Sequence, residues 1–217
     1  SGRVYCGAGI GGGGFGEGNN IKITGGTVNA TGGEGNNFYH FGGAGIGGGH
    51  HCGANDIIIS GNDTKVTATG KDGGAGIGGG YAGTANIITI SGGTVDATGG
   101  SHGAGIGGGY GANGTGEGGK ITLGGAANVT ASSVYGAGIG SGETISDGVY
   151  GTGQSGEVLI TENVTVKVSS RLGAGIGGGV PANYGSYGTG KDGRLTINGN
   201  ADVTAISMCA SGIGGGW

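Results

Sequence analysis

Short segments in which apolar and polar residues alternate recur along this 217-residue chain. In "ITISGGTVDATGG" at 88–100, the segments I-x-I and V-x-A each place alternate side chains on one side. A third such segment, A-x-I, lies in the phrase "GAGIGGG", found at 43–49, 74–80, 103–109 and 173–179. Alternation with a period of two predicts extended strands with one buried face, and no segment shows a helical period.

The three segments recur together as an internal repeat. The isoleucine of the phrase falls at Ile10, Ile46, Ile77, Ile106, Ile139, Ile176 and Ile213. Three short strands joined by Gly, Asn and Asp corners, repeated about every 30 residues, describe one coil of a parallel β-helix. We therefore predict one all-β domain over residues 1–217, a single-stranded parallel β-helix with three short strands per coil and about seven coils. We expect a right-handed coil, since that hand is the rule for parallel crossovers.

Stacked coils place like residues in ladders about 4.8 Å apart. Each isoleucine buried in such a ladder stabilises the fold by about 1.5–3 kcal/mol. These ladders offset the cost of ordering a chain with 68 glycines.

The glycines beside the isoleucine have two interpretations. Since Ala and Ile of the phrase point inward, we expect Gly45, Gly47 and Gly49 to point outward and form a flat face almost without side chains. Either these glycines only satisfy a curved backbone with positive φ, or the flat face receives another surface.

Composition excludes several classes of protein. Nine Lys and Arg residues scattered through a chain of net charge −4 form no basic stripe, so we expect no nucleic-acid partner. No run of about 20 apolar residues is present, so we expect no membrane span. Cys6, Cys52 and Cys209 are too few for a disulfide framework, and the sequence leaves their role open.

Aromatic residues at the corners are the candidate ligand-binding groups. His50, Tyr81 and Tyr110 directly follow the phrase in successive repeats, and the longest corners are rich in tyrosine. Such rings suit the apolar faces of sugars, but stacked rings can also simply stabilise the edge of a solenoid. The residues predicted to contact a ligand are Tyr81, Tyr110, Tyr150, Tyr184, Tyr187, Trp217, Phe38, Tyr39 and Phe41.

Catalytic chemistry has little support, and we predict no enzyme and no catalytic residue. Glycoside hydrolysis needs two carboxylates about 5–9.5 Å apart. Asp147, Glu143 and Asp192 in the long corners, with Lys191 nearby, form the only plausible cluster, which keeps a polysaccharide-acting enzyme as a weaker alternative.

Two further kinds of site are weighed and not favoured. His50, His51 and Cys52, with His40, invite a zinc site, but neighbouring strand residues point opposite ways, so we predict no metal ligand and no cofactor. Outward threonines of the V-x-A segments suggest an ice-binding surface, but Asp96 and Lys167 interrupt that rank.

The phrase and its partner "ITISGGTVDATGG" give a resemblance over almost the full length. The chain resembles the glycine-rich repeat regions of large adhesin-like surface proteins of Gram-positive bacteria. The resemblance implies an extracellular location, at the cell surface or secreted, and implies that 1–217 is a fragment of a larger surface protein. It transfers no catalytic residue.

We accordingly predict a non-enzymatic extracellular β-helix acting in adhesion or as a structural spacer. A carbohydrate-binding module that uses the flat glycine face and the Tyr-rich corners is the alternative. The expected partners are a glycan or host surface, or a second copy bound through the glycine face or the coil ends.

Overall fold

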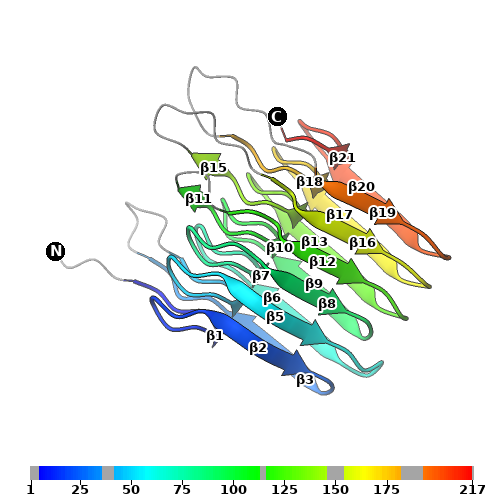
Figure 1. The fold of residues 1–217 in the computed structure, drawn as a ribbon, viewed down its shortest axis with the longest axis horizontal. Helices are drawn as coiled ribbons and strands as arrows, with labels where there is room; N and C mark the ends of the chain where they lie inside the picture. The colour runs from blue at the N-terminus through cyan, green and yellow to red at the C-terminus, as the bar shows by residue number, and fades with distance from the viewer. Residues whose placement is uncertain (1–4, 36–41, 113–115, 146–153, 182–192, 217) are drawn as a thin grey trace.

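A computed structural model describes residues 5–35, 42–112, 116–145, 154–181 and 193–216, and within them it contains strands and no helices. Figure 1 shows the turns stacked in chain order, from blue at the N-terminus to red at the C-terminus. The first sheet holds seven two-residue strands: β1 (Ile10–Gly11), β4 (Ile46–Gly47), β7 (Ile77–Gly78), β10 (Ile106–Gly107), β14 (Ile139–Gly140), β18 (Ile176–Gly177) and β21 (Ile213–Gly214).

Two longer sheets complete the tube. The second contains β2 (Gly18–Ile23), β5 (Ala54–Ile59), β8 (Ile87–Ile90), β12 (Lys120–Leu123), β16 (Glu157–Ile160) and β19 (Arg194–Ile197). The third contains β3 (Thr27–Thr31), β6 (Lys65–Thr69), β9 (Thr94–Thr98), β13 (Asn128–Ser133), β17 (Thr165–Ser170) and β20 (Asp202–Ser207). A small fourth sheet joins β11 (Gly111–Ala112) to β15 (Thr144–Ile145).

These sheets confirm the all-β parallel β-helix with three main strands per turn. The number of turns is slightly lower than the seven predicted, because the second and third sheets have six strands each and β21 alone begins a further turn. The fourth sheet lies where the corners lengthen, and Thr144 also bridges to Pro181. The first residues of the three longest corners after the phrase, which begin at 110, 143 and 180, therefore lie side by side.

The core is built from ladders of identical or similar residues in register. Ile106 pairs with Ile77 on one side and Ile139 on the other, and all three are fully buried. Strand β9 alternates exposed and buried residues, with Val95 and Ala97 inside. This alternation places the V-x-A side chains in the tube and their polar neighbours on its outer face.

The phrase glycines lie inside the wall of the tube, so the predicted outward glycine face is wrong. All residues of 43–49, 74–80, 103–109, 136–142 and 173–179 are buried. A Cβ on Gly45 would lie 2.6 Å from the backbone nitrogen of Thr69, and one on Gly47 would collide with the carbonyl oxygen of Gly78. Gly47 also has a φ of 134°. These glycines are required because neighbouring backbones pass too close for a side chain.

The C-terminal end of the tube leaves core-type residues partly open. Ile213 is 50% exposed, whereas Ile139 in the same ladder is fully buried. Ile197 is 44% exposed in the last turn, whereas Ile160 in the same ladder is fully buried. Self-association through the coil ends stays a prediction.

In the described part of the chain, no helix is long and apolar enough to cross a membrane.

Candidate functional site at the aromatic corner

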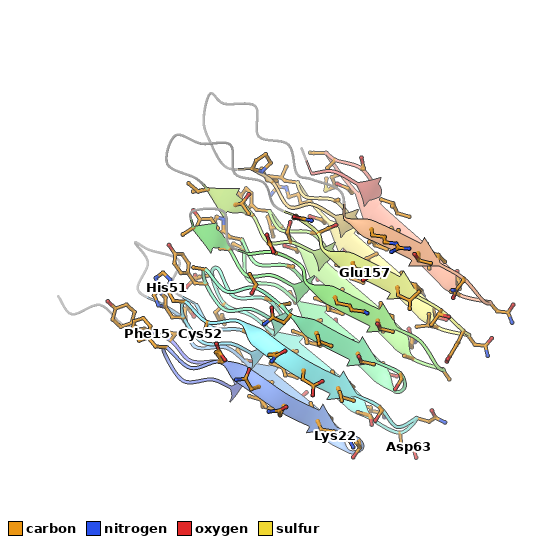
Figure 2. All side chains as sticks on the ribbon, viewed as in Figure 1. Phe15, Lys22, His51, Cys52, Asp63 and Glu157 are labelled. Atoms are coloured by element: carbon orange, nitrogen blue, oxygen red, sulfur yellow. The ribbon has the colours of Figure 1, made fainter. Side chains whose placement is uncertain are left out.

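Eight aromatic rings from the segments just before and just after the first-sheet strands gather at one corner of the tube, and we call them the ring cluster. It consists of Tyr5, Phe15, His50, His51, Tyr81, Tyr110, His102 and Tyr135. In Figure 2, the labelled Phe15 and His51 lie close together at this corner, at the opposite end of the strands from Lys22 and Asp63.

One column of the repeat supplies the centre of the cluster. The residue four places after the phrase isoleucine is His50, Tyr81 or Tyr110 in three successive turns. His50 and Tyr81 stack at 5.0 Å between ring centroids and 2° between planes, and Tyr81 lies 5.4 Å from Tyr110. The predicted ladder of rings after the phrase is therefore present in the described turns.

Rings that precede the phrase join the same cluster. Tyr5 lies 4.9 Å from His50. His102 lies 5.3 Å from Tyr110 and stacks on Tyr135 at 4.9 Å. The rings before and after the phrase thus form one continuous set of contacts.

Stacking limits what the predicted ligand-binding tyrosines offer to a ligand. Tyr110 is only 7% exposed, and one face of Tyr81 is covered by His50. Burial also raises the pKa of Tyr81. Of the nine residues predicted to bind a ligand, these are the two that the structure describes. The others, Tyr150, Tyr184, Tyr187, Trp217, Phe38, Tyr39 and Phe41, lie outside the described residues.

The surroundings of the His50 side chain disfavour its protonated, charged form. Its side chain is 1% exposed, and it lies among the rings of Tyr5, Phe15, His51 and Tyr81. Burial first, and the neighbouring His51 second, lower the pKa of His50 from 6.5 to about 4. The neutral imidazole is therefore the form that the folded corner accommodates.

We expect acid to destabilise the fold through His50. Because the unfolded chain takes up this proton at higher pH, the stabilisation is complete above pH 6.5 and is lost progressively as the pH falls towards 4. The free energy of unfolding should decrease by about 3 kcal/mol from this group. Urea unfolding at the two ends of this range measures it.

The matched control is His50→Tyr, since Tyr81 and Tyr110 occupy the same column. The variant retains the carboxylates that also titrate in acid, so the difference between the two proteins isolates His50. Equal pH dependence in both would contradict this assignment.

A buried acid–base pair lies beside the cluster. The Nδ1 atom of His102 contacts the Oε2 atom of Glu143, whose side chain is 7% exposed against 16% for His102. The backbone N–H of Glu143 also donates to the carbonyl of His102 at 2.8 Å. Sequence reasoning listed Glu143 among the acids of the long corners but did not find this pairing. Asp147, Lys191 and Asp192 lie outside the described residues.

The cysteines and histidines of the corner do not converge. The rings of His50 and His51 lie at 86° to one another. Cys6 donates through its thiol to the carbonyl of Glu34 at 2.9 Å. Burial is the main cause that raises the pKa of both Cys6 and Cys52, so neither thiol is activated. Across the described residues, no group of three His, Cys, Asp or Glu side chains is arranged to hold a metal ion.

Phe15 is the residue of this corner that the sequence did not single out. It is 61% exposed and contacts Tyr5 at 4.5 Å. A simple count would have found it, because Phe15 and His51 both stand five places after the phrase isoleucine.

Comparison with known proteins supports the fold. A family model described as the beta helix repeat matches residues 21–50, 57–81, 88–110 and 195–217. No curated protein and no solved structure matches the chain.

Proposed function

We propose that this chain, whose beta helix repeats stack as one tube, is a non-enzymatic, extracellular segment of a bacterial surface protein. It serves as a rigid spacer in adhesion. The observation that carries the proposal is the unbroken register of the three sheets. Every turn between β1 and β21 pairs with the next through the same columns of residues. A tube of this kind is stiff because each turn is held by backbone hydrogen bonds and by core ladders at once.

The acids of the described corner give the enzymatic alternative little support. Glu143 is buried against His102, which leaves it poorly placed to act on a polymer outside the tube. A pair of carboxylates at a suitable separation is the minimum for glycoside hydrolysis.

We expect two spin labels on one column of the third sheet to report a fixed distance. Asn29 and Thr204 are both exposed and lie five turns apart in the same column. Labels on N29C and T204C, with the natural cysteines replaced, should lie about 24 Å apart with a narrow distribution. Deleting residues 74–102, the turn from one phrase to the next, should shorten that distance by about 5 Å.

The matched control is deletion of residues 87–102, which removes β8 and β9 but leaves their phrase. This deletion breaks the register between successive turns and should abolish the narrow distribution of distances between the spin labels. A broad distribution in the complete chain would refute the rigid spacer. The extracellular location is tested separately, by antibody labelling of intact cells that produce the protein.

A further inference from the structure

Three exposed rings form an outer patch on the ring cluster. Phe15 is 61% exposed, Tyr5 is 38% exposed, and His51 is exposed as well. The rings of Phe15 and His51 are parallel within 4°, with centroids 6.3 Å apart.

The patch is held in place from behind. Buried His50 contacts all three rings, at 4.9 Å from Tyr5, 5.3 Å from Phe15 and 4.2 Å from His51. The backbone N–H of His50 donates to the backbone carbonyl of Cys6 at 2.9 Å. The backbone N–H of His51 donates to the backbone carbonyl of Tyr81 at 2.7 Å. Rings fixed in this way lose little freedom when a ligand binds.

The fold itself does not require these rings. The column of Phe15 and His51 continues with Ala82, Gly111, Thr144 and Pro181 in later turns. His51 and Ala82 have nearly the same backbone, with φ of 60° and 55°. Alanine therefore satisfies the backbone at the position of His51, and the exposed side chain of Phe15 contributes little buried surface to the fold.

A carboxylate lies close to the patch along the chain. Glu17 lies two residues after Phe15, and its negative charge is the second cause, after burial, that raises the pKa of the Cys52 thiol, the residue next to His51. The amide of Asn19 donates to that carboxylate at 2.8 Å. Among the described residues, the ion pairs are Lys71–Glu34 and His102–Glu143, so no cation there neutralises Glu17.

We propose that Tyr5, Phe15 and His51 form a shallow binding site for a neutral sugar ring, with Glu17 accepting hydrogen bonds from its hydroxyl groups. The apolar C–H face of a pyranose packs on flat aromatic rings, and carboxylates are good acceptors for hydroxyls. The unpaired negative charge of Glu17 disfavours acidic sugars. A protein partner would need about 800 Å² on each side, which three rings do not supply.

This inference rests on the adhesive part of the proposed function and gives it a ligand class. The test uses an array of neutral, sialylated and sulfated glycans, with immobilised choline as a cationic probe. The wild-type chain should retain at least one neutral glycan. Phe15→Ala and His51→Ala should each weaken that binding at least tenfold, and both should fold because Ala82 occupies the same column.

The matched control is Ile206→Ala, which removes an exposed apolar side chain from the last turn and should leave binding unchanged. Binding only to charged glycans or choline, no binding to neutral glycans, or equal binding by Phe15→Ala would each overturn the proposal. None of these outcomes affects the spin-label distances, so failure of the sugar site is distinguishable from failure of the spacer.

Discussion

Replacing Gly107 with alanine is expected to destabilise the protein by about 4 kcal/mol or more. Gly107 has a φ of 136°, and a Cβ there would collide with the carbonyl oxygen of Gly140 in the next turn. The backbone strain costs about 1–3 kcal/mol, and the overpacking adds about 1–3 kcal/mol or more. Urea unfolding followed by circular dichroism measures the loss, and failure to fold is the upper limit of the same effect.

Gly13→Ala is the matched control for that experiment. Gly13 also belongs to a run of glycines, but a Cβ there would have nothing within 4 Å, and its φ lies outside the positive range. We expect a change within about 0.5 kcal/mol. Similar losses for both variants would mean that glycine content in general, and not the close approach of adjacent turns, limits the stability.

Replacing Ile121 with alanine should cost about 3 kcal/mol. Ile121 is fully buried in β12 and lies in register between Ile88 of β8 and Val158 of β16. Removing its outer carbons leaves a cavity that neighbours fixed by strand pairing cannot fill, and comparable changes cost about 2–5 kcal/mol. The midpoint of urea unfolding should fall accordingly.

Ile87→Ala provides the comparison for Ile121. Ile87 is the first residue of β8, pairs with Lys120 and is 44% exposed. We expect a smaller loss, about 1 kcal/mol, because nearly half of its surface stays in water and gains nothing from folding. If the two variants lost the same stability, the inside and outside of the second sheet would be wrongly assigned.

The fold was predictable because its strongest signal is repetition. Counting from one phrase isoleucine to the next predicts the pairing of Ile77 with Ile106, and the structure has that pair. The position of the glycines was not predictable in the same way. Alternation correctly placed Ile106 inside, but it cannot show that the backbone of another strand lies against the opposite side, as Thr69 does against Gly45.

The site was predictable only in part. The spacing of His50, Tyr81 and Tyr110 indicated a ladder, and their rings do contact one another. Spacing alone could not show that stacking would cover the faces of those rings, because ring orientation depends on side-chain torsions at the corner. Phe15, the most exposed of these rings, was missed for a different reason, because it stands one place beyond the column of His50, Tyr81 and Tyr110.

Identical heptapeptides at the start of successive turns also bear on how such a gene can change. The copies at 43–49 and 103–109 occupy the same place in their turns. Recombination between the DNA encoding any two copies would insert or remove a whole number of turns, never a fraction of one. The length of the tube can therefore evolve in steps that leave the hydrogen bonds and core of the remaining turns unchanged.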